Sequence, residues 1–329
     1  MTLLRTTLLT SLLVLLLTPQ LSPAVVPSAP RLVVIIKFAT HPALDETEAG
    51  LVEALETATT TFPDLQIRTE RLNANGSPQL AKQLAETASR PEVALIVAIA
   101  TPAAQAVAHT PSSIPLLYGA VADPKGAGLF DTGRATGIRN VGENIIDAAL
   151  GFIRTAFPQA KRLGTLYNPA EQNSAYVQGL VSRLAPKWGF TLFQTPVNDK
   201  SRVATAAEAL AQKAEIIYSA NDNTVNAAVA SVVAVTRATK TPFFIGDLST
   251  LHAGALGAIG LEYRSMGKDL GAMAVAILAG ATLQSLPPRD APPPEIWIND
   301  DTVTATGVKL PLAAQVQIKH HVKGPSRAH

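Results

Sequence analysis

Cysteine is absent from the 329-residue chain, which excludes disulfide bonds, a lipid anchor on cysteine and thiol catalysis. Aromatic residues make up only 5% of the sequence although 47% of it is hydrophobic, so the core has to be built from Ala, Val, Leu and Ile. Lys and Arg total 27 against 25 for Asp and Glu, and no run of basic residues indicates a nucleic-acid partner. These absences favour a protein that is stabilised by aliphatic packing and does not bind nucleic acid.

Residues 1–24 predict a secretory signal peptide. Arg5 supplies a positive charge, Leu8 to Leu17 form an almost unbroken apolar stretch, and the small residues Ser22 and Ala24 suit a cleavage site. A membrane anchor needs about 20 apolar residues, which this stretch does not reach, and no second long apolar segment follows. We therefore expect an exported, periplasmic chain that is soluble after cleavage.

One stretch in the middle of the chain joins a buried strand directly to a helix. Residues 93–100 are apolar and uncharged, as expected for a strand that is covered on both faces of a parallel sheet. Thr101 suits the N-cap of a helix and Pro102 its first turn. The free N–H groups of such a helix start favour an anionic ligand group such as a carboxylate.

The same alternation of apolar strand and helix continues along the chain and predicts doubly wound parallel sheets. It occurs in two successive units of similar size, which repeat an architecture rather than a sequence. The predicted strands are residues 31–38, 65–72, 93–100, 115–120, 162–167, 190–195, 215–219, 242–245, 256–263 and 296–298. The predicted helices between them are residues 42–60, 78–89, 102–108, 145–156, 175–185, 202–213, 225–239, 249–253 and 266–279.

Small polar side chains follow most of the predicted strand ends. Because the carboxyl ends of parallel strands meet at one edge of a sheet, such residues are expected to line a ligand cleft between two facing sheets. Asp and Asn are also common helix caps and turn formers, so each of them taken singly also fits a structural role. The candidate ligand-binding residues at strand ends are Thr40, His41, Thr101, Asp123, Asn168, Asn173, Ser174, Asp222, Asn223 and Asp247.

Six segments, spread in order along almost the whole chain, resemble the periplasmic substrate-binding proteins of ABC transporters, in the family with tryptophan- and tyrosine-binding members. The resemblance implies the type I periplasmic-binding fold, an α/β fold of two doubly wound parallel-sheet lobes joined by a hinge. The segment 100–105 also adds Gln105 to the candidate ligand-binding residues. The matching segments are residues 41–45, 100–105, 123–129, 166–174, 221–224 and 254–260.

With that fold, we expect residues 31–138 and 249–293 in the first lobe, residues 139–248 and 294–322 in the second, and the ligand cleft between them. The resemblance further implies an amino-acid ligand, an aromatic one by family likeness alone, and a membrane permease with an ATPase as partners. We expect a monomer without a cofactor or a metal ion.

The sequence departs from the family pattern at three places, which leaves the ligand open but not the fold. Arg139 stands after the first lobe where the family usually has Ser, and it either faces the cleft, attracting a further anionic group, or points to solvent. Asn221 replaces Thr before Asp222, and residues 246–249 replace a Thr or Ser-Asp element.

The expected mechanism is capture of a ligand by closure of the lobes. Thr101 and the N–H groups after it would receive a carboxylate, Asp222 or Asp247 would pair with an ammonium, and Asn168 with Ser174 would orient the ligand. Changing the ratio of closed to open protein from 1:99 to 99:1 takes about 5.5 kcal/mol of differential affinity. A handful of charge-assisted hydrogen bonds supplies this free energy. Tyr118, Tyr167 or Tyr263 could also pack on an apolar side chain of the ligand, but we expect each of them in the core.

Two other functions fit the same fold. The protein can deliver its ligand-bound form to a membrane sensor or chemoreceptor instead of a permease, and no feature of the chain separates the two. An exported α/β enzyme is the other alternative. The motifs of nucleophile-elbow hydrolases, P-loop proteins and zinc proteases do not occur, and His41 is the only histidine at a strand end. We therefore expect a binding protein rather than an enzyme.

Overall fold

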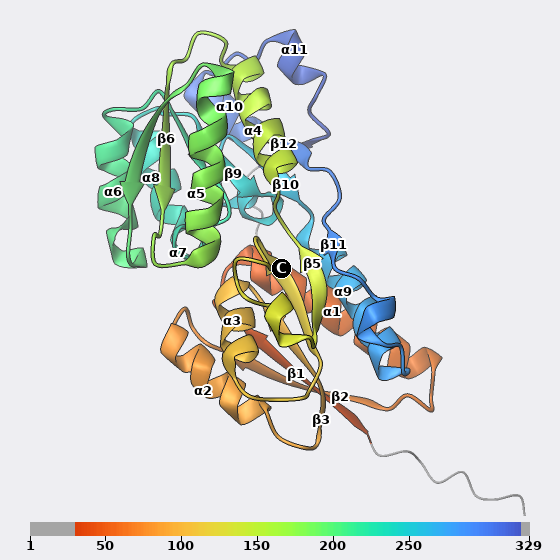
Figure 1. Ribbon diagram of the computed structural model, residues 1–329. Helices are drawn as coiled ribbons and strands as arrows, with labels where there is room; N and C mark the ends of the chain where they lie inside the picture. The colour runs from red at the N-terminus through yellow and green to blue at the C-terminus, as the bar shows by residue number, and fades with distance from the viewer. Residues whose placement is uncertain (1–29, 324–329) are drawn as a thin grey trace, which may run out of the picture.

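The computed structural model describes residues 30–323, so the predicted signal peptide lies outside the described residues. The strands of this range form a six-stranded and a seven-stranded sheet, each the centre of one lobe with helices on its faces (Figure 1). The predicted architecture of two α/β lobes is confirmed. Among the helices of residues 30–323, none has the length and apolar character needed to cross a bilayer.

The first lobe is built on a parallel sheet with the strand order β11-β5-β4-β3-β1-β2. Its strands are β1 (Arg31–Lys37), β2 (Ile67–Asn73), β3 (Val93–Ile99), β4 (Leu116–Val121), β5 (Ala135–Arg139) and β11 (Arg289–Asp290). Its helices are α1 (Pro42–Thr61), α2 (Pro78–Ala88), α3 (Thr101–His109) and α9 (Tyr263–Leu278), with the 3₁₀ turns η1 (Phe130–Thr132) and η5 (Leu283–Ser285).

The second lobe has the strand order β13-β12-β10-β9-β8-β6-β7, and its sheet is parallel except where β12 runs antiparallel to β10. Its strands are β6 (Arg162–Tyr167), β7 (Thr191–Pro196), β8 (Ile216–Ser219), β9 (Phe243–Asp247), β10 (Gly257–Leu261), β12 (Glu295–Asn299) and β13 (His320–Val322). Its helices are α4 (Glu143–Ala156), α5 (Gln172–Leu184), α6 (Val203–Ala211), α7 (Asn223–Asn226), α8 (Val229–Ala238), α10 (Asp300–Thr306) and α11 (Leu312–Gln315), with the 3₁₀ turns η2 (Ala185–Trp188), η3 (Lys200–Arg202) and η4 (Leu248–Ala253).

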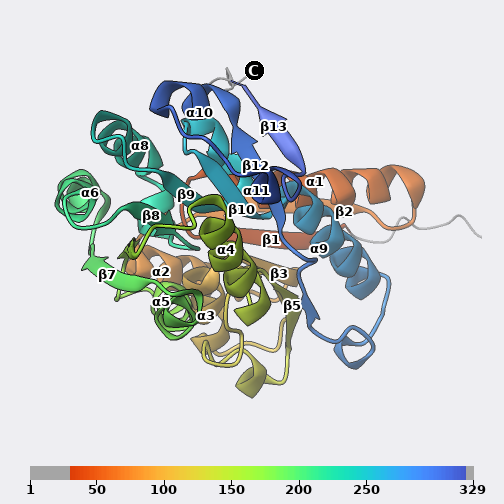
Figure 2. The same ribbon diagram turned by 90° about the horizontal axis from the view of Figure 1, so that it is seen from above.

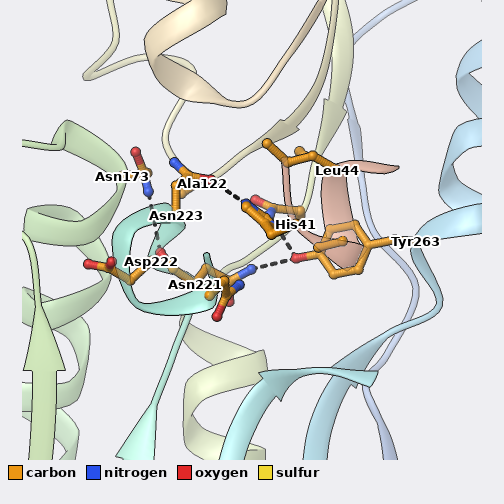
Figure 3. Close-up of a pocket in the computed structure, with 12 residues that line it drawn as sticks. His41, Leu44, Ala122, Asn173, Asn221, Asp222, Asn223 and Tyr263 are labelled. Atoms are coloured by element: carbon orange, nitrogen blue, oxygen red, sulfur yellow. Dashed lines mark hydrogen bonds between the residues drawn. The ribbon is translucent and has the colours of Figure 1, made fainter. Parts of the chain in front are cut away.

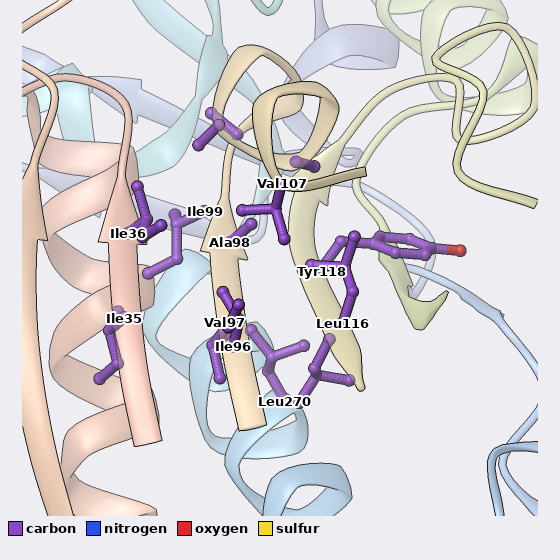
Figure 4. Close-up of a cluster of buried hydrophobic side chains, with 14 of the residues drawn as sticks. Ile35, Ile36, Ile96, Val97, Ala98, Ile99, Val107, Leu116, Tyr118 and Leu270 are labelled. Atoms are coloured by element: carbon purple, nitrogen blue, oxygen red, sulfur yellow. The ribbon is translucent and has the colours of Figure 1, made fainter. Parts of the chain in front are cut away.

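Aliphatic side chains fill the core of the first lobe, as the composition predicts. Strands β1 and β3 are buried on both faces, and Ile35, Ile96 and Ile99 have no exposed surface (Figure 4). Each side chain of this size gains about 1.5–3 kcal/mol from full burial, so the central strands anchor the positions of the loops that follow them. Tyr118 lies in this core, as expected.

Helices α1 and α9, far apart in the sequence, lie side by side on one face of the first sheet (Figures 1 and 2). Glycine allows this close approach. A Cβ on Gly50 would come within 2.1 Å of the Arg264 carbonyl oxygen, and one on Gly267 within 2.2 Å of the Thr47 carbonyl oxygen. The packing fixes the start of α9, and therefore Tyr263, against the start of α1.

The chain passes between the lobes at three places within residues 30–323: between β5 and α4, between β10 and α9, and between β11 and β12. We expected residues 249–293 in the first lobe, and this is wrong for residues 249–261. The turn η4 is a short connection that returns the chain to the same sheet, where β10 pairs with β9. The crossing comes after β10.

Candidate functional site

A small, nearly filled cavity with a volume of about 20 Å³ lies where the two lobes face each other (Figure 3). Its walls come from the loops after β1, β4, β5 and β8 and from the first turns of α1, α5, α7 and α9. The strand ends of both sheets therefore do converge, as the parallel topology predicts. The lining residues are His41, Ala43, Leu44, Ala120, Ala122, Asn140, Asn173, Asn221, Asp222, Asn223, Asn226 and Tyr263.

His41 places a neutral imidazole at the junction of the lobes. Its backbone caps α1, because its carbonyl oxygen accepts from the N–H groups of Leu44 and Asp45. Its buried ring is linked across the cleft to Asn223, with Nε2 3.1 Å from Oδ1 (Figure 3). Burial lowers the pKa of His41 from 6.5 to about 4, so the ring is uncharged at neutral pH.

Glu171 fixes the orientation of Asn223. The Asn223 Nδ2 donates to Glu171 Oε2 over 2.5 Å, and the Thr224 hydroxyl donates to Glu171 Oε1 over 2.7 Å. Since Asn223 turns its amide nitrogen to the carboxylate, its Oδ1 faces His41. Glu171 itself is buried at the start of α5, so the charged group lies just behind the cavity wall.

Three internal donors hold the Asp222 carboxylate. Its Oδ1 accepts from the Val225 N–H over 2.7 Å and caps α7, while its Oδ2 accepts from the Asn168 N–H over 2.6 Å and from the Ser174 hydroxyl over 2.5 Å. Burial and the neighbouring Glu171 raise the pKa of Asp222 against the opposing effect of these bonds. Asp222 therefore ties together the loops of the second lobe. Its direct pairing with a ligand ammonium stays a prediction.

The hydroxyl of Tyr263 joins two of the three hinge crossings to the second lobe. It accepts from Asn140 Nδ2 over 3.1 Å and from Asn221 Nδ2 over 2.6 Å. Asn140 follows β5 at the first crossing, and Tyr263 begins α9 after the second. Tyr263 is buried as expected, but it also lines the cavity.

Four buried acceptors on the cavity wall have no hydrogen-bond partner within residues 30–323. They are His41 Nδ1 and the Oδ1 atoms of Asn140, Asn173 and Asn226. Buried polar groups in native proteins are nearly always paired, because an unpaired group costs the free energy of its lost hydration. A ligand with several N–H or O–H donors fits this wall.

The candidate residues from the sequence fall into three groups. His41, Asn173, Asp222 and Asn223 line the cavity. Thr40 and Asn168, again with Asn223, line a wider groove between the lobes with a volume of about 650 Å³, and Gln105 lies in a further hollow beside Gln172. The structure does not bring the other four residues to these walls; they are Thr101, Asp123, Ser174 and Asp247.

Thr101 differs from its expected role as a helix cap. Ala100 occupies the N-cap position with a φ of +81°, and Thr101 is the first residue of α3. The Thr101 hydroxyl is fully buried and accepts from the Ala122 N–H over 3.4 Å. The hydroxyl thus supports the cavity wall at Ala122, and its contact with a ligand carboxylate stays a prediction.

The remaining acidic candidates also have local partners. Asp123 accepts from the Gly126 N–H over 3.0 Å and, across the cleft, from Gln172 Nε2 over 3.3 Å. Asp247 caps η4 through the Ser249 N–H, and burial raises its pKa to about 6. Arg139, for which the sequence left two orientations open, pairs with Asp290 on the neighbouring strand β11.

Sequence reasoning missed four polar residues of the cavity, Asn140, Asn221, Asn226 and Tyr263. Asn140 and Tyr263 follow strand ends at the hinge, so the rule that selected the other candidates applies to them too. Asn221 stood out only as a departure from the family pattern. Asn226 lies inside α7, where no pattern of the sequence marks it.

Residues 32–322 match the model of the family described as "ABC transporter substrate binding protein". The chain belongs to this family. Members of the family bind small ligands for a transporter, so the chain is placed among binding proteins. A tyrosine-binding protein of Clostridioides difficile (strain R20291) is 29% identical over 274 residues, which are 82% of this chain and 79% of that protein.

Solved structures show the same fold. A conserved domain protein from Vibrio cholerae gives a TM-score of 0.82 at 28% identity, over 89% of this chain and 99% of that one. A domain from Streptococcus pneumonia in complex with L-Trp gives 0.81 at 23% identity, over 88% and 100%. A ligand-free, open substrate-binding protein with adhesive properties from Clostridium difficile gives 0.66 at 28% identity, over 89% and 99%.

The comparison also bears on the arrangement of the lobes. The open structure matches the chain at the same identity and coverage as the Vibrio cholerae protein, yet its TM-score is 0.66 against 0.82. The direct contacts between the lobes, such as His41 with Asn223 and Asp123 with Gln172, are those of a closed cleft.

Proposed function

We propose that the protein captures an amino acid in the periplasm, closes its lobes around it and delivers it to the permease and ATPase of an ABC transporter. The observation that carries this proposal is the cavity between the lobes, with four unpaired acceptors on its wall. An α-ammonium group, with three N–H donors, suits such acceptors. The tyrosine-binding relative and the L-Trp complex support an aromatic amino acid.

Ammonium recognition by neutral acceptors fits the charges of the wall. Asp222 has three internal donors, so the carbonyl oxygens of Asn140, Asn173 and Asn226 and the Nδ1 of His41 are the groups that remain for a ligand. Each hydrogen bond to a charged group contributes about 1.5–3 kcal/mol.

The other ends of an amino acid also find partners on the wall. Tyr263 accepts two hydrogen bonds and keeps its own O–H, which can donate to a carboxylate oxygen. Ala43, Leu44, Ala120 and Ala122 form an apolar part of the wall against which an aromatic or aliphatic side chain can pack.

Closure follows from contacts that only the closed state makes. His41 with Asn223, Asp123 with Gln172 and Tyr263 with Asn221 each join the first lobe or its hinge to the second. A ligand that adds contacts to both lobes shifts the population to this state. We propose that the mature chain acts as a soluble monomer in this cycle.

A thermal-shift screen tests the proposal. The mature chain is heated with the common L-amino acids and with nucleosides, sugars and short peptides as comparison classes. A ligand at a hundredfold excess over its Kd stabilises the protein by about 2.7 kcal/mol, which raises the melting temperature measurably. Stabilisation by L-tyrosine or L-tryptophan supports the proposal. Stabilisation only by a sugar or a nucleoside contradicts it.

A further inference from the structure

A chain of hydrogen bonds runs from a carboxylate of the second lobe to the imidazole of the first. Glu171 accepts from the Asn223 amide nitrogen over 2.5 Å, and the Asn223 carbonyl oxygen lies 3.1 Å from His41 Nε2. An ionised carboxylate only accepts hydrogen bonds, so Glu171 binds the nitrogen end of the Asn223 amide. The oxygen end of that amide then faces the His41 ring. An amide oxygen only accepts, so the proton of the neutral ring has to be on Nε2.

The consequence is an acceptor at the other ring nitrogen. With the proton on Nε2, His41 Nδ1 carries a lone pair, and this atom is buried without a partner within residues 30–323. His41 itself lines the cavity. The acceptor depends on closure, since Glu171 and Asn223 belong to the second lobe and His41 to the first.

We propose that His41 is a specificity-determining residue whose Nδ1 accepts a hydrogen bond from the ligand ammonium, and that Glu171, acting through Asn223, is a positioning residue that selects the required tautomer when the lobes close. The inference rests on the proposed capture of an amino acid between the lobes. It adds that the closed, loaded state requires a deprotonated His41, so binding at mildly acidic pH releases a proton.

The charged groups around the ring decide the sign of the pH dependence. Asp45 on α1 favours the protonated ring and Lys37 on β1 disfavours it, while burial has the largest effect and lowers the pKa. Glu171 faces the ring only through Asn223. In an open cleft the ring is hydrated and its pKa returns towards 6.5. Closure is therefore favoured above pH 6.5 and is opposed increasingly as the pH falls towards 4.

Asp222, on the same wall, also titrates in the acidic range, but all its partners belong to the second lobe. Burial is the largest cause of its raised pKa, so opening of the cleft also changes the protonation of Asp222. Subtracting the pH profile of a His41 variant from that of the wild type isolates the contribution of His41.

Two substitutions separate the two ring nitrogens. In His41→Gln the side-chain amide can reach Asn223 as Nε2 does, but no acceptor replaces Nδ1. In His41→Asn the shorter amide places its polar atoms near the Nδ1 position and cannot titrate. His321→Gln is the matched control, because His321 lies on β13 and pairs with Asp300 far from the cleft.

The experiment is isothermal titration of the mature protein with L-tyrosine and L-tryptophan between pH 5 and 8, in buffers of different ionisation enthalpy. The wild type is expected to lose affinity by up to about tenfold per pH unit below pH 6.5 and to release protons on binding. His41→Gln is expected to bind about tenfold more weakly at pH 7.5 and to lose the proton release, with a partial recovery of affinity in His41→Asn. His321→Gln should match the wild type.

Nitrogen NMR of histidine-labelled protein tests Glu171 separately. In the loaded wild type, His41 should show a protonated Nε2 and an unprotonated Nδ1, and in Glu171→Gln the two tautomers should mix. Equal pH profiles in the wild type and His41→Gln, or an unchanged tautomer in Glu171→Gln, would overturn the inference while leaving the proposed function intact. Failure of both amino acids to bind the wild type at pH 7.5 would reject the proposed ligand and this inference with it.

Discussion

Asn140 donates its side-chain N–H to the hydroxyl of Tyr263 over 3.1 Å, although the two residues are 123 positions apart. Each residue stands at a different crossing between the lobes, so this bond ties two of the three hinge segments together beside the cavity. Asn221 of the second lobe shares the same hydroxyl. A single oxygen atom thereby connects the hinge, the second lobe and the cavity wall.

Tyr263→Phe removes this oxygen and keeps the ring in place. We expect lower stability, by about 1–3 kcal/mol for the buried Asn140 amide donor and by less for the half-buried Asn221 donor, and weaker amino-acid binding with a more open average shape. Urea unfolding, titration calorimetry and small-angle scattering measure the three effects. Tyr118→Phe is the control, because the buried Tyr118 hydroxyl has no partner among residues 30–323. Equal behaviour of the two variants would refute the hinge role.

Asp222→Ala should destabilise the second lobe as well as affect binding. Loss of a helix cap costs about 0.5–2 kcal/mol, the Ser174 hydroxyl also loses its acceptor, and the Asn168 N–H keeps only the Ser174 hydroxyl oxygen. Urea unfolding of the ligand-free protein checks this. Asp199→Ala, which removes a cap at the exposed turn η3, should have a smaller effect. A ligand-free Asp222→Ala protein as stable as the wild type would show that the carboxylate has no structural role.

Asp247→Asn should make the protein more stable at neutral and higher pH. The pKa of the buried Asp247 is raised from 3.8 to about 6, so the folded state holds a proton that the unfolded state has lost between these values. The wild type therefore loses stability through this group as the pH rises from 4 to 6, by about 3 kcal/mol in all. Asp247→Asn has no carboxyl group to titrate at this position, so its stability does not fall for this reason as the pH rises.

Unfolding free energies of both proteins at pH 4, 6 and 8 provide the measurement. The advantage of Asp247→Asn should grow with pH and level off above about pH 7. A constant difference across this range would mean that Asp247 keeps an ordinary pKa. Asn keeps an oxygen that can cap η4 through the Ser249 N–H, so the cap itself is not at issue.

Arg139→Gln should leave ligand affinity within about twofold, because the guanidinium pairs with Asp290 and a partly exposed ion pair contributes about 1 kcal/mol or less. Calorimetry with L-tyrosine and L-tryptophan checks this. A large loss of affinity would place Arg139 at the ligand and support the alternative orientation that the sequence left open.

Local sequence patterns were sufficient for the alternating strands and helices of the two α/β units, but not for the crossing after β10. Continuous apolar runs such as residues 93–99 predict buried strands because burial on both faces removes the need for polar alternation. Proline after a polar residue predicts the starts of α1 and α2 because its ring fits the first turn. The polar residues at strand ends predicted the place of the cleft, since parallel topology brings those ends together.

Only the tertiary structure decided which polar groups of the cleft remain available. His41 and Asn223 meet over a separation of 182 residues, and Glu171 orients the amide between them. Asp222, one of the two acids expected to pair with a ligand ammonium, already accepts from donors of its own lobe. The hydrophobic periodicity of a local segment determines which of its residues are buried. Whether a buried carboxylate or imidazole is free to bind depends on donors and acceptors that folding brings from distant positions.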